Sequence, residues 1–370
     1  MRLKAPHEGW VSLRCLGPDP AAPAVAETAA APPEATTAPE ATTAPFAAAS
    51  AFPPLPPFPE APSRAAPRFD DGVIVAPSDR QVARSRVGSR LPGSIEGVEA
   101  LSASVVCVRG ANPSYETGPG TNTFLVGAGR ERVLIDTADG NDTWRRRLAR
   151  VCDAEDLSIS RVLLTHSHWD HAGGLDWVRA TWPRCAALPA SLRDGEVCAL
   201  GRGAALRGVA TPGHCNDHVS YQLLAPTRDG NDDDDGALFT GDLVLGEGTV
   251  LVLAPPAGSM DDYLASLLRV RDLRPSSIHP GHGHSLVGRG LCCAYAEEYV
   301  RVRLERERQI LGCLSAGADT ADGVVNMIYG HRPGFTAEMR TAATWTTTAS
   351  LLRLARLGAC ARQGRRWRPT

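Results

Sequence analysis

Short runs of apolar and β-branched residues recur between about residue 104 and residue 279, and each ends in polar or turn-forming residues. Such runs are typical of strands, and they predict strands at 104–108, 123–126, 132–135, 161–164, 208–210, 219–224, 237–240 and 277–279. Segments 142–151 and 260–270 carry apolar residues at helical spacing, in the second case Tyr263, Leu264, Leu267 and Leu268. Strands and helices mixed in this order predict an α/β fold of two sheets flanked by helices.

The pattern becomes helical after His284. Helices are predicted over 296–314, 321–329 and 337–357, followed by a hairpin over 358–369. After Glu338 this region has no acid, and it carries the arginines Arg340, Arg353, Arg356, Arg362, Arg365, Arg366 and Arg368. A segment of one charge sign can bind phosphates, while the alternative is a solvated helix face with a frayed terminus.

Residues 21–67 differ in composition from the rest of the chain. They are mostly Ala, Pro and Thr, with a near-repeat of Pro-Glu-Ala-Thr-Thr-Ala. A segment with so little to bury is expected to be disordered, and folding is expected to begin near 91–96. The predicted organisation is therefore a disordered leader at 1–92, an α/β domain at 93–290 and a helical module at 291–370.

Charge, hydrophobicity and cysteine usage bear on the expected partners and cellular location of the protein. The net charge of −2 gives no general attraction to nucleic acid or anionic membranes. No stretch reaches the roughly 20 apolar residues that span a bilayer, so a soluble protein is expected, with no membrane partner. The ten cysteines include no C-x-x-C pair, and the leader carries acids that transit peptides avoid. We expect an intracellular protein, with its oligomeric state left open.

The densest chemistry lies at 165–174, directly after the predicted strand 161–164. His166 and His168 are two residues apart, and Asp170 and His171 follow at the expected start of a helix. This spacing lets the first pair face one point and the second pair a neighbouring one. Imidazole nitrogens and carboxylates gathered so closely are typical of a binding site for a metal such as zinc.

Three further strand ends carry residues of the same type. His214 follows a Pro-Gly turn, Asp242 follows Thr-Gly, and His282 follows a second Pro-Gly turn. Any one of them alone would be read as a surface residue, but together they predict two ions sharing one cleft. One ion would take His166, His168 and His214, the other Asp170, His171 and His282, with Asp242 bridging both.

The run His166-Ser167-His168-Trp169-Asp170-His171 resembles the H-x-H-x-D-H signature of the metallo-beta-lactamase superfamily. The segments 120–127, 134–137, 211–218, 241–249 and 280–283 are similar, in the same order, to those of the beta-lactamase-like protein 2 group within it. The resemblance implies an αββα sandwich at 93–290, two Zn²⁺ ions on the seven positions above, and a winged-helix-like module at 291–370. The group includes mitochondrial members, so both mitochondrial and cytoplasmic localisation stay open.

The resemblance also assigns roles beyond the ligands. Asp136 matches a buried aspartate that orients a ligand, and His218 matches a residue that touches substrate, supports His214 or is simply a satisfied loop histidine. Ala138 replaces the glycine of the usual Asp-Thr-Gly, which affects the local turn. Cys215 is read as a neighbour of His214 and not as a ligand.

The expected reaction is hydrolysis by a metal-bridging hydroxide, with Asp170 and Asp242 as the catalytic carboxylates. The resemblance implies single-stranded RNA as the first substrate, cut as an endoribonuclease. The alternative is hydrolysis of a small thioester or lactone, as in glyoxalase II. A non-catalytic binding protein is disfavoured because every ligand position is kept, and di-iron redox chemistry because His168 is intact.

Overall fold

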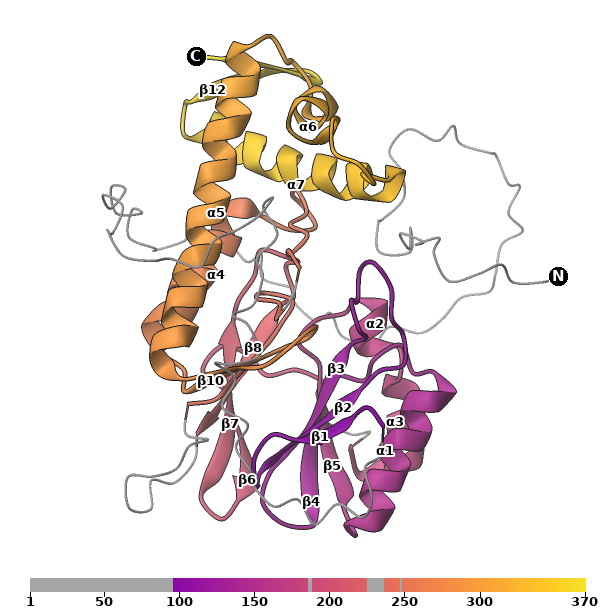
Figure 1. The fold of residues 1–370 in the computed structure, drawn as a ribbon. Coiled ribbons are helices and arrows are strands. Elements are labelled where there is room, and N and C mark those ends of the chain that lie inside the picture. Colours follow the sequence, from indigo (N-terminus) through magenta and orange to yellow (C-terminus); the bar gives the residue numbers. More distant parts are fainter. Residues whose placement is uncertain (1–95, 186–187, 225–235, 247) are drawn as a thin grey trace, which may run out of the picture. The chain divides into compact units, whose positions relative to one another are not determined.

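The computed structural model describes residues 96–185, 188–224, 236–246 and 248–370. The predicted leader at 1–92 lies outside these residues. Two sheets face each other, helices cover the outer face of each, and a helical module follows (Figure 1). None of the described helices is both long and apolar enough to cross a bilayer.

The first sheet has five strands in chain order. They are β1 Val98–Ala100, β2 Val105–Arg109, β3 Asn122–Val126, β4 Glu131–Ile135 and β5 Ser158–Leu163. Only β4 and β5 run parallel, and α1 (Asp142–Ala154) makes the crossover that a parallel pair requires. The helix starts after Asn141, whose side chain accepts hydrogen bonds from the first-turn N–H groups of Thr143 and Trp144.

The second sheet has six strands in the order β11-β10-β9-β8-β7-β6. Their bounds are β6 Val197–Gly201, β7 Ala204–Ala210, β8 Val219–Leu224, β9 Leu238–Gly241, β10 Ser277–Pro280 and β11 Leu286–Val287. Strands β9 and β10 are parallel, joined through α4 (Met260–Leu273), and β7 and β9 are both antiparallel to β8. The carboxyl ends of β7, β9 and β10 therefore meet at one edge.

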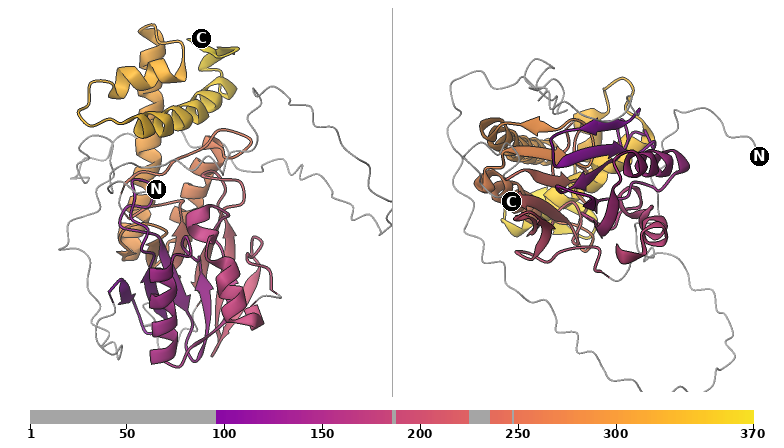
Figure 2. Two further views of the ribbon diagram at one scale, coloured as in Figure 1. Left: turned by 90° about the vertical axis from the view of Figure 1, so that its right-hand side faces the viewer. Right: turned by 90° about the horizontal axis from the view of Figure 1, so that it is seen from below.

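Three apolar layers hold the sandwich together. Between the sheets, Phe124 of β3 packs against Phe239 of β9, with ring centroids 5.0 Å apart. The neighbouring Leu125 points the other way and packs under Trp144 of α1, as alternation along a strand requires. Tyr263 of α4 covers the outer face of the second sheet. The expected αββα sandwich is thus formed, and the two turned views show the same layering (Figure 2).

Several elements differ from the sequence prediction. Helix α3 (Leu175–Thr181), the 3₁₀ turn η2 (Pro183–Cys185) and the short strands β1, β6 and β11 have no counterpart among the predicted elements. Helix α2 (Trp169–Ala172) corresponds to the helix expected to start at Asp170, and it is only four residues long. Helix α5 spans Arg289–Ser315 and so begins before residue 296. Its first turns carry Cys292 and Tyr295, which are buried against the second sheet, and only its later turns show the charged pattern that signals a helix.

The C-terminal module contains the predicted helices and hairpin. These are α6 Ala321–Tyr329, α7 Ala337–Arg356, β12 Cys360–Gln363 and β13 Arg366–Pro369, packed on the second half of α5 around Ile310, Leu351 and Trp367. Arg353 of α7 is buried and pairs with Glu307 of α5 and with Asp261 of α4. The ion pair between Arg353 and Asp261 ties the module to the sandwich.

Candidate metal centre

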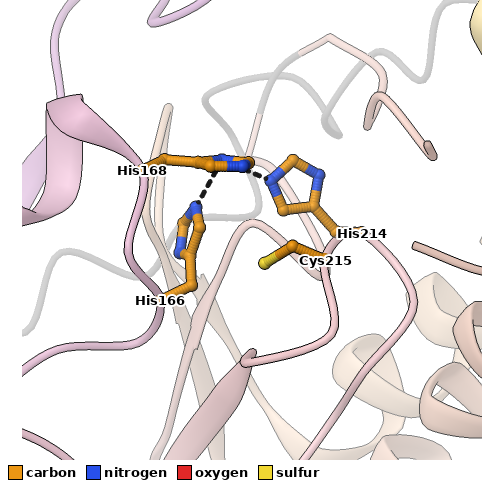
Figure 3. A group of neighbouring side chains, drawn as sticks. All are labelled: His166, His168, His214 and Cys215. Carbon is orange, nitrogen blue, oxygen red and sulfur yellow. Dashed lines mark hydrogen bonds between the residues drawn. The ribbon is translucent and has the colours of Figure 1, made fainter. Parts of the chain in front are cut away.

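Three histidine rings from two loops converge at the mouth of the sandwich. His166 and His168 follow β5, and His214 follows β7. Nδ1 of His168 lies 2.9 Å from Nε2 of His166 and 3.0 Å from Nε2 of His214 (Figure 3). All three nitrogens therefore point into one small volume.

The partners of the opposite ring nitrogens determine what these three nitrogens offer. Nδ1 of His214 donates to the carbonyl of Leu251 at 2.6 Å. The Thr165 hydroxyl donates to Asp136, so at 3.0 Å from His166 its oxygen can only accept from the Nδ1–H of that ring. Nε2 of His166 and of His214 must then both carry lone pairs, and one proton on His168 could satisfy only one of them. A divalent cation fits this donor set better than any arrangement of protons.

A second group lies beside the first. Nε2 of His171 is 3.3 Å from Nε2 of His282, and Oδ2 of Asp170 is 3.4 Å and 3.2 Å from these two nitrogens. Nδ1 of His171 donates to Asp136 at 2.8 Å, so its Nε2 is directed toward His282. Burial lowers the pKa of His171, but the carboxylates of Asp170, Asp242 and Asp136 raise it well above the ordinary value, so Nε2 would offer a lone pair once a cation takes the place of its proton. Two imidazoles and a carboxylate are thus gathered as a second set of ligands.

Asp242 connects the two groups. Its Oδ1 lies 3.3 Å from Nε2 of both His171 and His282, and its Oδ2 lies 3.8 Å from Nε2 of His214. Oδ1 is buried, and it has no hydrogen-bond partner within the part of the chain that the structure describes. A buried carboxylate oxygen without a donor is costly unless a cation meets it. The seven residues selected from the sequence are therefore brought together in the predicted arrangement of two groups and a bridge.

Electrostatics within the site keep its two carboxylates ionised. Burial would raise the pKa of Asp242, but His282 and His171 hold it well below the ordinary value. The same balance lowers the pKa of Asp170, with His171 opposing the effect of burial. Burial lowers the pKa of His168 to about 4, so this ring is neutral and able to act as a ligand near pH 7.

Glycines allow the ligand loops to approach this closely. A Cβ on Gly281 would lie 2.7 Å from both Asp242 Oδ1 and His171 Cε1. Gly241 has a φ of +48°, and its Cβ would meet Thr165 at 2.7 Å. The glycines of the Thr-Gly-Asp and Pro-Gly-His sequences thus allow the ligand loops to pack closely as well as to turn.

Comparison with known proteins identifies the family. Residues 117–193 match the model of the metallo-beta-lactamase superfamily. The beta-lactamase-like protein 2 homolog of Caenorhabditis elegans is 32% identical over 256 residues, which are 65% of this chain and 81% of that protein. The chain belongs to the metallo-beta-lactamase superfamily. Another superfamily relative, thioesterase pkgB of Emericella nidulans, is 36% identical over 62% of this chain and 64% of its own length. An atrochrysone carboxyl ACP thioesterase of Aspergillus chevalieri is 33% identical over 66% of this chain and 79% of that protein.

Solved structures of superfamily proteins share the fold. A beta-lactamase domain protein from Burkholderia ambifaria superposes with a TM-score of 0.59 at 20% identity, covering 74% of this chain and 93% of that one. A metallo-beta-lactamase family protein from Thermus thermophilus gives 0.56 at 23% identity, covering 73% and 100%. At these identities the likeness concerns the fold alone.

The sequence analysis also singled out three residues beside the proposed ligands, namely Asp136, His218 and Cys215. Asp136 accepts from His171 and from Thr165, the orienting position that the superfamily resemblance implied. His218 is buried, with Nδ1 bonded to Thr211 at 2.9 Å and Nε2 accepting from the backbone N–H of Asp242 at 3.1 Å, so it positions Asp242 and is closed to substrate. Cys215 lies beside His214 and near the other two histidines of the first group (Figure 3), and burial raises the pKa of its thiol. That Cys215 is a neighbour and not a ligand stays a prediction.

The turn after Asp136 forms although Ala138 replaces the usual glycine. Ala138 adopts a φ of +48° and is fully buried, so the left-handed turn is kept with a methyl group in place. Asp136 itself has a φ of +59°. These strained positions lie next to the ligands, where such conformations are often found.

Sequence reasoning missed supporting residues that carry no metal-ligand signal. Asn122 of β3 donates through its side chain to the carbonyls of Pro280 at 3.0 Å and Gly283 at 2.9 Å, which fixes the loop of His282. Thr165 links Asp136 to His166. Asp217 accepts from the backbone N–H of Ser167 at 2.9 Å and steadies the first histidine loop. In the sequence, such residues stand out only as polar residues near the end of a strand.

Proposed function

We propose that this chain is a hydrolase that holds two divalent cations, with zinc favoured by the donor types, on the seven residues described above. The observation that carries the proposal is the convergence of ring nitrogens from His166, His168 and His214, which have at most one proton to share among them. Bound there, the cations would supply Lewis acidity and an activated water.

The chain's own residues prepare the site for this chemistry. Asp136 holds His171 with its Nε2 directed inward. Asp242 presents one oxygen to each group, and Asp170 adds negative charge to the second. In this proposal the ionised side chains of Asp170 and Asp242 are the catalytic carboxylates. Because the Cys215 thiol stays protonated, cysteine is not a candidate nucleophile here.

An acyl thioester is the substrate class that we place first. The names of three relatives that are 31–36% identical to this chain are those of thioesterases. Single-stranded RNA is the second candidate, favoured by the exposed ring of Tyr115 and by the ring pair Tyr329 and Phe335, stacked at 5.2 Å, since bases stack on such rings. Against RNA, much of the arginine-rich tail is neutralised, because Arg340, Arg353, Arg356 and Arg366 pair with acids.

A direct comparison of substrates tests the proposal. Full-length protein is stripped with a chelator, reloaded with zinc, and given S-lactoylglutathione, acetyl-coenzyme A and a single-stranded oligoribonucleotide in parallel. We expect thioester hydrolysis that disappears on stripping and in His168→Ala. Cleavage of the oligoribonucleotide alone would reverse the order of the two candidates, and no metal-dependent turnover of any substrate would refute the proposal.

Three further assignments remain predictions that accompany this function. They are the winged-helix character of the C-terminal module, the intracellular location, either mitochondrial or cytoplasmic, and the identity of the metal as zinc.

A further inference from the structure

A pocket of about 610 Å³ lies between α5 and α6, outside the seven-residue metal centre. Its lining is rich in cationic and polar side chains, among them Arg301, Arg306, Gln309, His331 and Arg332. A volume of this size suits a small molecule or one part of a larger ligand.

Two of the lining arginines share one aromatic ring. The guanidinium carbon of Arg306 lies 4.8 Å from the ring centroid of Tyr329, and that of Arg332 lies 5.0 Å from it. Phe335 stacks on the same tyrosine, with ring planes 19° apart. Burial lowers the pKa of Arg306, and the charge of Arg332 lowers it further. The positive charges of Arg306 and Arg332 therefore lie close together, in surroundings that are partly shielded from water.

The acids near this pair are already engaged. Glu305 lines the pocket but pairs with Arg308, and Glu298 pairs with Arg301 on the same helix. In the described part of the chain, Arg306 has no carboxylate partner. The pocket therefore carries uncompensated positive charge at Arg306, the condition under which an anion gains most from binding.

The loop before β3 reaches the metal centre. Thr121 forms an isolated β-bridge with His282, and its hydroxyl lies 3.4 Å from Oδ2 of Asp170. Tyr115 belongs to the same loop, and burial and the nearby Tyr329 at the end of α6 raise the pKa of its hydroxyl. This loop is therefore the segment that connects the surroundings of Tyr329 with the ligands Asp170 and His282.

We propose that the pocket lined by Arg306 and Arg332 binds the phosphate of a phosphopantetheine-linked thioester whose acyl end lies at the metal centre. This rests on the proposed thioesterase function. Two guanidinium groups held over one tyrosine ring supply positive charge and N–H donors of the kind that bind phosphate. An RNA backbone would need a continuous basic track, whereas several tail arginines are paired with acids and Arg301, Arg306 and Arg332 line one open pocket.

Three thioesters with the same acyl and thiol ends separate phosphate binding from chemistry. Acetyl-N-acetylcysteamine has no phosphate, acetyl-phosphopantetheine has one, and acetyl-coenzyme A has further phosphates. For the zinc-loaded wild type, we expect kcat/KM to be at least about tenfold higher for acetyl-phosphopantetheine than for acetyl-N-acetylcysteamine, through KM. In Arg306→Gln this advantage should shrink by about tenfold with kcat unchanged, and the phosphate-free substrate should be unaffected. A gain only with acetyl-coenzyme A would overturn the pantetheine phosphate as the bound group.

Arg365→Gln is the matched control, because Arg365 is exposed in the turn between β12 and β13 and the variant removes the same charge. It should behave as wild type with all three thioesters. Circular dichroism checks folding, and Arg332→Gln carries the same test should Arg306→Gln fail to fold.

A binding measurement on metal-stripped protein separates this proposal from the proposed function. Calorimetry with phosphopantetheine should give a Kd that rises about tenfold in Arg306→Gln and not in Arg365→Gln. Binding with this dependence but without thioester turnover would support the pocket and refute the thioesterase assignment. Equal binding by wild type and Arg306→Gln, or a loss confined to an oligoribonucleotide, would overturn the pocket's assignment.

Discussion

Replacing Asp136 by asparagine changes one atom of the support beneath the metal ligands. Asp136 accepts from the backbone N–H of Thr165 at 2.7 Å, from its hydroxyl at 2.9 Å and from Nδ1 of His171 at 2.8 Å. In the asparagine, an NH₂ group replaces one of the two carboxylate oxygens. Each of these oxygens accepts from an N–H group in the wild type, so at either position two donors would face each other. The least costly response is for His171 to lose the Nδ1 proton and carry it on Nε2, which removes the lone pair offered to the metal. We expect zinc affinity to fall between about tenfold and a hundredfold, or about 1.4–2.8 kcal/mol.

The assay is competition for zinc between the protein and a chromophoric chelator, with turnover measured in parallel. Asp217→Asn is the control: its carboxylate accepts from the backbone N–H of Ser167, a bond that an amide oxygen can also accept. It should bind zinc within about threefold of wild type, since a bond that the variant keeps costs little. If Asp136→Asn bound zinc as wild type does while Asp217→Asn did too, the orienting role of Asp136 would be refuted.

The remaining predictions concern the bridge, the ligand loop and the module contact. Asp242→Ala and His168→Ala should abolish turnover while the far-ultraviolet circular dichroism stays that of wild type, and undiminished activity in either would contradict the ligand assignment. Gly281→Ala should lower zinc affinity at least about tenfold, measured by chelator competition, because its Cβ would lie 2.7 Å from Asp242 Oδ1. Burial raises the pKa of Glu307 to about 7 from its ordinary value of 4.5, so the folded chain holds a proton that the unfolded chain releases, and stability falls as the pH rises from 4.5 to 7. Relative to Glu307→Gln, the wild type should lose up to about 3 kcal/mol of unfolding free energy over this range in urea titrations, and parallel pH profiles would contradict it.

The sandwich is predictable where apolar periodicity is strong. The predicted run 219–224 matches β8, and the predicted helix 321–329 matches α6. Strand β6 escapes prediction because its residues alternate between exposed and buried without a run of branched side chains. Short helix α2 is expected only as the start of a helix at Asp170, since four residues are too few to show a period. Local pattern thus identifies the long elements, and tertiary contacts determine the short ones.

The arginine-rich tail illustrates a different limit of the sequence. No acid follows Glu338, so the sequence predicts a segment of one charge sign. In the fold, Arg356 pairs with Asp261, Arg366 pairs with Asp319, and Arg353 pairs with Glu307. These acids come from α4, from α5 and from the loop after α5, so charge compensation across the chain could not be read from a single segment. Within the described residues, Arg306 of α5 also has no carboxylate partner, although the sequence of that helix contains both charge signs.

The convergence of the seven candidate ligands could be predicted because metal binding demands particular atoms, whereas the residues that support them could be any polar residue at a strand end. Asn122 belongs to the first sheet and binds the carbonyls of Pro280 and Gly283 in the second. The first sheet supplies the loop from His166 to His171, and the second supplies the other three ligands. A cation bound between them therefore links the two sheets as a cross-link would. By mass action, each ion at a hundredfold excess over its Kd adds about 2.7 kcal/mol to the stability of the sandwich, so metal binding and sheet packing stabilise each other.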